Sequence, residues 1–344
     1  MISGNELGIA VNTRCLLGQL TGVQRYTGEI LARLPAPISR LSSGRLLRGH
    51  LWEQVVLPSM AKGHLLWSPA NTGPITVRRQ VVTVHDISPV DHPEWFSRGF
   101  SAWYRCLWPL LLENVRHVVT DSEFTRHRLV ERFGLDPARI TAIPLGVDPC
   151  FRGAVGRVPT TLADQLDGKR FVLAVGSLDP RKNLPFLVRA FTLARARLGP
   201  DWRLVIAGGA NARIFSDAGL PGDDGAVILA GRISDQDLPG LYAAADVFAY
   251  PSLYEGFGLP PLEAMAAGTP VIASSATSIP EATGGAALSC DPRCIEEFAA
   301  GLVRVAIDGE LRAELRRAGL ARADEFTWDR TARAVLQVLT RHAR

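Results

Sequence analysis

The chain alternates short apolar runs with longer segments in which apolar residues recur every three or four positions. Apolar runs that stop at Gly, Pro or polar residues predict buried parallel strands, whereas the longer periodicity predicts amphipathic helices. Strand and helix follow one another along most of the chain. This alternation predicts an α/β fold in which helices cover parallel sheets.

The first strand lies within LGIAVNTRCLL, which runs into a loop that contains Gly18 and Gly22. The helix that follows has one apolar side, made of Val23, Tyr26, Ile30 and Leu34. A strand, a glycine loop and a helix form the usual start of a Rossmann-like domain. The G-x-G-x-x-G dinucleotide pattern is absent, which argues against a dehydrogenase.

The run VVTV predicts a second strand, and His85 and Asp86 follow it directly. Because ligands bind at the carboxyl ends of parallel strands, His85 is a candidate site residue, although a packed histidine is an equal alternative. Asp86 either orients the imidazole or caps the next turn. HVVT predicts another strand, followed by a helix that is N-capped by Ser122 and ends at Gly134.

Two segments of the first half are harder to interpret. Residues 35–64 are rich in Pro, Ser and Arg, and the pattern around LWEQVVLP does not place their elements. EWFSRGFSAWYRCLWPLLLENV is strongly aromatic and reads either as a membrane-facing amphipathic helix or as a core helix that also lines an acceptor cleft. We favour the core helix, because Pro109 interrupts the pattern and few Arg are present. ARITAIPLGVDPCF predicts a last strand and a domain boundary near residue 150.

The second half begins with a polar linker, 152–170, and the strand, loop and helix of RFVLAVGSLDPRKNLPFLVRAF. Strands follow in DWRLVIAGG and AVILAGRIS. Asp235 and Asp237 form a D-x-D pattern that could suggest a metal, but Ser234 and Asp237 fit a capping box better. Residues 295–320 predict one Arg- and Glu-rich helix, and FTWDRTARAVLQVLTRH predicts a final amphipathic helix.

The stretch YPSLYEGFGLPPLEAMAAGTPVIAS predicts a strand end, a glycine loop, a short helix and another strand. Gly256 and Gly258 allow the backbone to approach a ligand, and Pro260 and Pro261 suit the first turn of a helix. The free N–H groups and positive dipole end of such a helix attract phosphate.

Two carboxylates accompany this loop. Glu263, which we place in the first turn, reads either as an acid that complements the helix dipole or as an acceptor for ribose hydroxyls. Glu255 lies at a strand end, where α/β proteins bind ligands, and could accept hydrogen bonds from a sugar. Together they suggest a nucleotide-sugar site.

Length and composition set limits on the remaining possibilities. The 344 residues suffice for two domains of ordinary size. Residues 1–150 carry 16 Lys and Arg against 12 Asp and Glu, and residues 151–344 carry 22 of each. This excess is too small to argue for nucleic acid, although the basic half allows contact with an anionic acceptor or a membrane surface.

Cysteine usage and hydropathy indicate the compartment. The five cysteines are odd in number and lack paired metal spacing, so we expect reduced thiols in a cytoplasmic protein and no zinc site. The N-terminus lacks the pattern of a signal peptide, and no apolar run approaches the ~20 residues that span a bilayer. Membrane contact would therefore be peripheral, on the inner face of the cell membrane.

Glu255 and Glu263, within EGFGLPPLEAMAAGTPVI, resemble the E-x7-E signature of glycosyltransferase family 4. The resemblance implies a retaining enzyme in which two Rossmann-like domains face each other across a cleft, the GT-B arrangement. It makes residues 1–150 the acceptor-side domain and 151–328 the nucleotide-sugar donor domain. Residues 329–344 would form a helix that returns to the N-terminal domain.

The resemblance also implies residue roles. Glu263 would contact the donor ribose, while Glu255 and His85 would lie by the donor sugar. VGSLDPRKN is similar to the family loop whose cations neutralise the leaving diphosphate, here Arg181 and Lys182, although Ser177 stands where many members carry Arg. Lys62, Lys169 and Lys182 are the only lysines of the chain, so a lysine in this loop suggests a specific need for a compact ammonium. Further donor contacts are expected from Gly22, Ile233, Gly256, Phe257, Gly258 and Leu259.

These expectations describe a glycosyltransferase that uses neither metal nor cofactor. It would move a hexose from a nucleoside-diphosphate sugar to a glycan or lipid-linked acceptor in polysaccharide synthesis. LWEQVVLP and TVHDISPVDHPEWF are similar to the bacterial mannosyl branch, which points to GDP-mannose. The alternatives are a non-catalytic sugar-nucleotide-binding subunit, a GT-B epimerase, or a phosphorylase, which would need a pyridoxal lysine.

Overall fold

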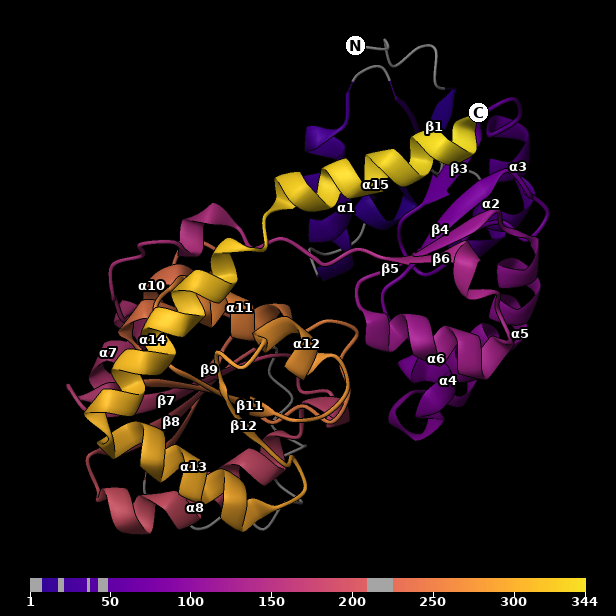
Figure 1. Ribbon diagram of the computed structural model, residues 1–344. Coiled ribbons are helices and arrows are strands. Elements are labelled where there is room, and N and C mark those ends of the chain that lie inside the picture. Colours follow the sequence, from indigo (N-terminus) through magenta and orange to yellow (C-terminus); the bar gives the residue numbers. More distant parts are fainter. Residues whose placement is uncertain (1–7, 18–21, 36–37, 43–48, 209–224) are drawn as a thin grey trace. The chain divides into compact units, whose positions relative to one another are not determined.

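The computed structural model describes residues 8–17, 22–35, 38–42, 49–208 and 225–344. The chain forms two compact units (Figure 1). Unit 1 consists of Met1–Gly146 and Thr327–Arg344, and unit 2 of Val147–Phe326. The sequence predicted these junctions near residues 150 and 328.

Unit 1 contains a parallel six-stranded sheet in the order β2-β1-β3-β4-β5-β6. Its strands are β1 (Ile9–Asn12), β2 (Ser39–Leu41), β3 (Leu65–Ser68), β4 (Gln80–Val84), β5 (His117–Thr120) and β6 (Ile140–Ala142). Because β2 and β3 lie on opposite sides of β1, the direction of strand addition reverses there. A reversal of this kind opens a crevice at the carboxyl ends of the strands.

Helices cover both faces of this sheet. They are α1 (Gly22–Arg33), α2 (Gly49–Val55), α3 (Leu57–Met60), α4 (Ser88–Asp91), α5 (Arg98–Asn114), α6 (Glu123–Phe133) and α15 (Trp328–Ala343). Ile9 and Val11 pack in the same cluster as α1 and α15, whereas Ala10 packs with α2 and α3. This alternation follows from the two-residue period of a strand. It also shows why a buried parallel strand is apolar throughout.

The predicted limits of α6 are confirmed. The Ser122 hydroxyl accepts a hydrogen bond from the Thr125 amide at 3.1 Å, and Gly134 adopts a left-handed conformation at the other end. The core interpretation of the aromatic segment is also confirmed, because α5 buries Tyr104 and Trp108 among its apolar contacts. Residues 35–64, which the sequence did not resolve, contain β2, α2 and α3.

Unit 2 contains a second parallel six-stranded sheet in the order β12-β11-β10-β7-β8-β9. Its strands are β7 (Arg170–Val175), β8 (Trp202–Ala207), β9 (Val227–Gly231), β10 (Val247–Tyr250), β11 (Val271–Ser274) and β12 (Leu288–Cys290). Its helices are α7 (Thr160–Leu166), α8 (Leu184–Leu198), α10 (Leu238–Ala244), α11 (Leu259–Ala266), α12 (Ile279–Thr283), α13 (Ile295–Ile307) and α14 (Gly309–Asp324). The inward residues of β7, Val172 and Ala174, share a core with α8 and α13.

Two predictions for unit 2 were wrong in detail. The Arg- and Glu-rich segment forms two helices rather than one, because Asp308 leaves the helical conformation and its carboxylate caps α14 by accepting from the Leu311 amide at 3.0 Å. The linker at 152–170 is not wholly irregular, since it contains α7. All five cysteines are unpaired. No helix of the described residues combines the length and apolar character needed to cross a membrane.

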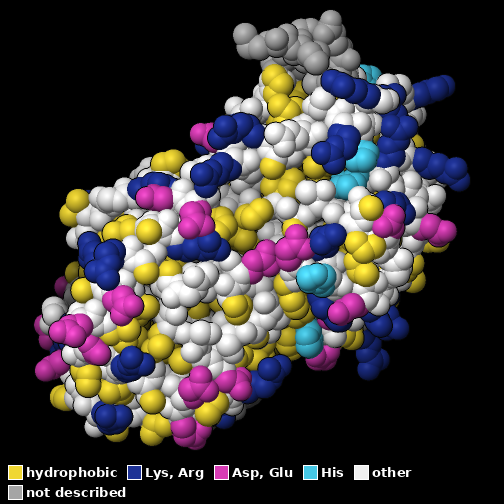
Figure 2. All heavy atoms as spheres, in the orientation of Figure 1, with side chains coloured by type: hydrophobic (Ala, Val, Ile, Leu, Met, Phe, Trp, Pro, Cys, Tyr) yellow, Lys and Arg dark blue, Asp and Glu magenta, His cyan; other side chains and the backbone are white. Residues whose placement is uncertain are grey.

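Two arginines bind the end of α15. Figure 2 shows Lys and Arg side chains gathered at the end of unit 1 that carries the C-terminus. Arg79 and Arg116 donate hydrogen bonds to the carbonyls of Ala343 and His342 in α15. The helix C-terminus has unpaired carbonyls and a negative dipole end, so these guanidinium groups dock it onto the sheet.

His117 at the start of β5 makes this docking sensitive to pH. Its ring stacks on that of His342 with centroids 4.6 Å apart, and its Nε2 lies 2.7 Å from the Thr141 hydroxyl. Burial, together with the positive charges of His342, Arg341 and Arg139, lowers the pKa of His117 to about 4. His117 is therefore harder to protonate in the folded chain than in the unfolded chain.

We expect acidification to destabilise unit 1 through His117. An unfolded histidine has a pKa of about 6.5, so this contribution to stability is full above that pH and is lost as the pH falls towards 4. In His117→Gln, urea unfolding at pH 7 and pH 5 should show a pH-dependent loss smaller by about 1 kcal/mol, after allowance for solvent screening. The control is His127→Gln, on the exposed surface of α6. Equal pH dependence in both variants would contradict the assignment.

Candidate functional site

A buried ion pair forms where β10 meets the glycine loop of unit 2. Tyr250 is the last residue of β10, Glu255 follows in the loop, and Lys182 ends the short 3-10 turn before α8. The Lys182 ammonium donates to Glu255 Oε1 at 2.6 Å and to the Tyr250 hydroxyl at 2.8 Å. The Tyr250 hydroxyl in turn donates to the same carboxylate oxygen at 2.8 Å. The fold thus joins two predicted site residues and adds Tyr250, which the sequence analysis missed despite its place at a strand end.

The charges of this cluster determine what it can do. Burial would raise the pKa of Glu255, but the positive charges of Lys182 and Arg181 outweigh this effect and lower the pKa to about 2. Burial and the neighbouring carboxylate raise the pKa of Tyr250 well above its usual value. Glu255 is therefore ionised at neutral pH, and it can accept hydrogen bonds from hydroxyls but cannot serve as an acid.

Arg181 borders the same carboxylate. Its Nη1 lies 3.8 Å from Glu255 Oε2, and its Nε donates to Asp179 Oδ2 at 3.1 Å. The Arg181 carbonyl accepts from the Leu253 amide at 2.7 Å, which ties the cation loop to the loop after β10. Asn183 adopts a left-handed conformation, and its side-chain Nδ2 donates to the Pro251 carbonyl at 3.3 Å. Two loops distant in sequence are therefore held as one structure.

The glycine loop leads directly into α11. Gly258 precedes the helix with φ = 108°, a conformation that favours glycine. Phe257 is buried and packs against Phe326, with ring centroids 5.7 Å apart. The backbone of Glu255 is held at both ends, because its amide donates to Thr277 Oγ1 at 3.2 Å and its carbonyl accepts from Ser278 Oγ at 2.9 Å.

Glu263 occupies a different position from the one predicted. The eight residues of α11 begin at Leu259, so Glu263 lies beyond the first turn, which contains no acid. The interpretation that it complements the dipole from the first turn is therefore wrong. Its carboxylate is buried and accepts from the Tyr242 hydroxyl at 3.0 Å. Pro260 and Pro261 do stand in the first turn, as predicted.

His85 belongs to unit 1 and has partners at both ring nitrogens. Nδ1 lies 2.7 Å from Asp121 Oδ2, and Nε2 lies 2.9 Å from the carbonyl of Pro69. Burial opposes the imidazolium, but the charge and hydrogen bond of Asp121 outweigh it and raise the pKa of His85. A contact from Nε2 to a sugar would have to replace the Pro69 carbonyl.

The residue that orients His85 is Asp121 and not Asp86. Asp86 Oδ1 accepts from the amide of Ser88 at 2.9 Å and from its hydroxyl at 2.5 Å, so it caps the turn that begins α4. The first of the two alternatives for Asp86 was therefore wrong. Asp121 follows β5, and the sheet order places the end of β5 beside the end of β4.

The remaining predicted residues belong to other elements of the two units. Gly22 is the first residue of α1, an added Cβ there would meet nothing within 4 Å, and the preceding residues 18–21, with Gly18, are outside the described part of the chain. Ile233 is half-buried in the loop after β9. The Asp237 amide donates to Ser234 Oγ at 3.1 Å, but α10 begins only at Leu238 and its N-cap residue, Asp237, makes no side-chain cap hydrogen bond, so the predicted capping box is a bonded turn that precedes the helix. Among the described residues, no three His, Cys, Asp or Glu side chains are grouped so as to hold a metal ion.

Both halves of the chain match known family descriptions. Residues 163–322 match the family "Glycosyl transferases group 1", and residues 58–150 match "Glycosyltransferase Family 4". The first match lies within unit 2, and the second covers part of unit 1 and ends four residues into unit 2.

Similar proteins include mannosyltransferases. The chain is 32% identical over 307 residues to O-antigen chain mannosyltransferase B of Escherichia coli, with 88% of this chain and 80% of that protein covered. It is 26% identical over 275 residues to O-antigen chain mannosyltransferase RfbU of Salmonella typhimurium, covering 77% of this chain and 73% of that protein. It is also 32% identical over 178 residues to the serotype-specific mannosyltransferase WbdA of Escherichia coli. That match covers 50% of this chain but only 22% of WbdA.

Solved structures share the fold at low sequence identity. Anabaena HepE, solved in complex with UDP and glucose, superposes with a TM-score of 0.73 at 18% identity, covering 97% of this chain and 99% of that one. WaaG, a glycosyltransferase of lipopolysaccharide biosynthesis, superposes with a TM-score of 0.71 at 16% identity, covering 96% and 99% of the two chains. At these identities the likeness concerns the fold.

Proposed function

Because the chain belongs to glycosyltransferase family 4 and has the GT-B fold, we propose that it is a retaining mannosyltransferase. It moves mannose from GDP-mannose to a glycan or lipid-linked acceptor in the synthesis of a surface polysaccharide. The mannosyltransferase relatives support the sugar and the pathway. The observation that carries the proposal is the buried pair of Lys182 and Glu255 beside the start of α11.

In this proposal the donor diphosphate is bound by unit 2. Charge that develops on the leaving diphosphate is stabilised by Lys182 and Arg181 and by the amide groups at the start of α11, from Gly256 to Leu259. Preorganised groups of this kind usually supply the largest part of a rate enhancement. The cations take the place of a metal ion, so the transfer needs none.

The carboxylates recognise the rest of the donor. Glu263 accepts hydrogen bonds from the ribose, and Glu255 accepts them from the sugar, a role that suits a carboxylate with a pKa of about 2. We also propose that His85 contacts the sugar, that Ile233 contacts the base through its backbone, and that Gly22 binds the phosphates. No nucleophile is assigned.

Nucleotide binding tests the donor site. We expect GDP to raise the melting temperature more than UDP or ADP, because the proposed donor is GDP-mannose. A ligand present at a hundred times its Kd stabilises the native state by about 2.7 kcal/mol. The companion measurement is transfer of labelled mannose from GDP-mannose. A binding subunit would show the shift without transfer, and an epimerase would release a free sugar without an acceptor. No shift with any of the three nucleotides would reject the donor site.

Replacing Glu263 with glutamine should weaken GDP binding about tenfold, because an ionised acceptor for the ribose becomes a neutral one. Gln can still accept from Tyr242 through its carbonyl oxygen, so the fold should be retained. Calorimetric titration with GDP provides the measurement, and Glu310→Gln on the exposed surface of α14 is the control. Unchanged affinity in Glu263→Gln would remove the ribose role.

A further inference from the structure

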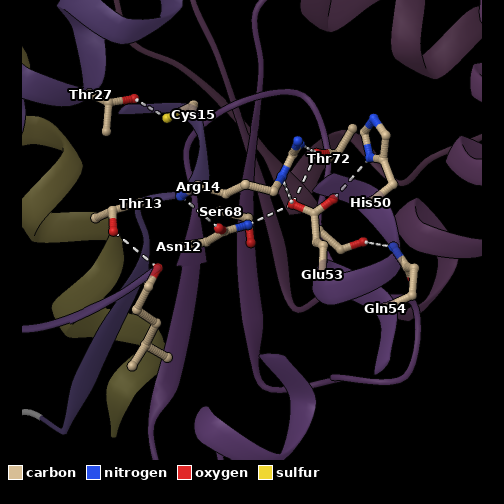
Figure 3. A network of polar contacts seen from close by, with 12 residues as sticks. Asn12, Thr13, Arg14, Cys15, Thr27, His50, Glu53, Gln54, Ser68 and Thr72 are labelled. Carbon is tan, nitrogen blue, oxygen red and sulfur yellow. Dashed lines mark hydrogen bonds and ion pairs between the residues drawn. The ribbon is translucent and has the colours of Figure 1, made fainter. Parts of the chain in front are cut away.

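Unit 1 contains a second polar cluster that the donor site does not use. It is built around Glu53 of α2, whose side chain is 0% exposed (Figure 3). The cluster lies where the strand order reverses, because Asn12 ends β1 and Thr72 follows β3. That is the place in a parallel α/β sheet where ligands bind.

Four side chains converge on the Glu53 carboxylate (Figure 3). Oε1 accepts from Asn12 Nδ2 at 2.7 Å, from Thr72 Oγ1 at 3.1 Å and from Arg14 Nε at 3.3 Å. Oε2 lies 3.3 Å from His50 Nδ1. Burial would raise the pKa of Glu53, but the partners His50, Arg14, Asn12 and Thr72 outweigh it and lower the pKa. The carboxylate is thus ionised, fully satisfied and unable to bind a ligand itself.

The two groups that Glu53 holds keep donors of their own. Arg14 is 20% exposed; its Nε and Nη2 are used by Glu53 and Thr72, and its Nη1 donates to no residue that the structure describes. His50 is 41% exposed, and its Nε2 has no hydrogen-bond partner among the described residues. Glu53 therefore fixes the orientation of two partly exposed groups without using up their donors.

Aromatic side chains of α5 border these donors. The Trp103 ring packs against His50 with centroids 4.8 Å apart, and its buried Nε1 has no partner among the described residues. The Tyr104 hydroxyl lies within the influence of Asp86, Arg14 and Glu53, and burial and the two acids raise its pKa to about 12. An orphaned buried N–H beside a polar cluster is rare in native proteins and is satisfied by a ligand or by water.

The charge balance selects the kind of ligand. Glu53 cancels the charge of Arg14, and Asp86 adds a negative charge nearby, so the cluster lacks the excess positive charge that a phosphate requires. It offers directional donors, a phenol and an aromatic ring instead. Such groups suit a neutral ligand that carries both hydroxyls and an apolar face, and a pyranose ring has that chemistry.

We propose that Arg14 and His50 bind a neutral pyranose unit of the acceptor glycan, with Trp103 as an adjacent wall and Glu53 as the positioning residue for both. This proposal rests on the proposed function, since it takes the second substrate to be a glycan. It gives the acceptor a subsite within unit 1 at the carboxyl ends of β1 and β3.

Titration with a surrogate acceptor tests the subsite. Octyl α-D-mannopyranoside would be titrated into the full-length protein by saturation-transfer NMR, and GDP by calorimetry. We expect Arg14→Ala and His50→Ala each to weaken mannoside binding at least tenfold while GDP affinity changes less than twofold. Arg14→Lys keeps the charge but loses the planar fork, and should weaken binding as much as Arg14→Ala. Mannose 1-phosphate should not compete better than methyl α-D-mannopyranoside.

Controls separate binding from structure. Arg132→Ala, at an exposed arginine of α6, should change neither affinity. If Arg14→Ala fails to fold, His50→Ala provides the test. The His50 side chain is more exposed than that of Arg14, so its loss should disturb the fold less. Unchanged mannoside affinity in His50→Ala, stronger competition by mannose 1-phosphate, or no saturable mannoside binding by the wild type would overturn the subsite. GDP binding would persist in each case, so failure of the donor site remains distinguishable.

Glu53→Gln tests the positioning role. The amide keeps the volume of the carboxylate but loses the charge that attracts Arg14 and His50. We expect weaker mannoside binding and no further loss when Arg14→Ala is added, because both changes remove the same oriented donor. A purely structural role would lower the melting temperature and leave the affinity of the folded protein unchanged, which would contradict the assignment.

Discussion

Replacing Lys182 with alanine is expected to lower mannose transfer by about 10² to 10³-fold, the effect of removing one preorganised donor from a developing anion. The ammonium is positioned by Glu255 at 2.6 Å and Tyr250 at 2.8 Å, and no other lysine stands near it in the sequence. GDP affinity should fall as well. Lys182→Arg should restore only part of the activity, because a planar guanidinium is larger than a compact ammonium and directs its donors differently.

The same substitution should destabilise unit 2 at neutral pH. Removing one partner of a buried ion pair leaves the other charge uncompensated, at a cost of about 3–5 kcal/mol, and Arg181 at 3.8 Å from Glu255 offsets part of it. In the wild type the lowered pKa of Glu255 contributes stability above about pH 4.5, which is lost as the pH falls towards 2. In Lys182→Ala, protonation of Glu255 relieves the unpaired charge, so the difference between the two proteins should shrink in acid.

Urea unfolding at pH 7 and pH 3.5 measures this difference, and the transfer assay measures the activity. Lys169→Ala is the matched control, since Lys169 pairs at 3.7 Å with an exposed Asp167. The double variant with Glu255→Gln should be more stable than Lys182→Ala alone, because it removes the orphaned charge. A Lys182→Ala protein with normal transfer and normal GDP affinity would remove Lys182 from the donor site.

Replacing Gly208 with alanine is expected to cost about 3 kcal/mol or more of folding free energy, from a strained backbone together with a steric clash. Gly208 follows β8 with φ = 157°, and an added Cβ would lie 1.7 Å from the carbonyl oxygen of Gly176. Neither backbone can move freely, because the Gly176 amide donates to Ala207 at 2.9 Å and the Gly208 amide donates to Gly231 at 2.8 Å.

This clash should also disturb the loop that contains Arg181 and Lys182. A Cβ at Gly176 would lie 3.4 Å from the Lys182 side chain, so that side chain lies close to the Gly176 backbone. Displacing it should weaken GDP binding in whatever fraction of Gly208→Ala remains folded. Gly28→Ala, in α1, is the control: nothing lies within 4 Å of the added Cβ, and a stabilisation of about 0.5–1 kcal/mol is expected. Thermal unfolding with and without GDP compares them, and similar melting temperatures would contradict the prediction.

The sequence by itself determined the α/β class, most of the strands, and the ends of α6. These features depend on signals that lie within one turn or one strand of each other, such as Ser122 and Gly134 at the two ends of α6. The E-x7-E signature identified the family for the same reason, since Glu255 and Glu263 belong to one continuous stretch. Local propensity and spacing suffice for such features.

Only the tertiary structure decided which side chains meet. His85 contacts Asp121, 36 residues away, rather than its neighbour Asp86. Glu53 contacts Asn12 across 41 residues, and Lys182 contacts Glu255 across 73 residues. Each pairing depends on which strands are adjacent in the sheet. That order depends on how the connections between parallel strands pack, which involves residues throughout the unit. Glu53 illustrates the limit: it lies in a weakly patterned segment, and its importance appears only when the fold brings β1, α2 and the end of β3 together.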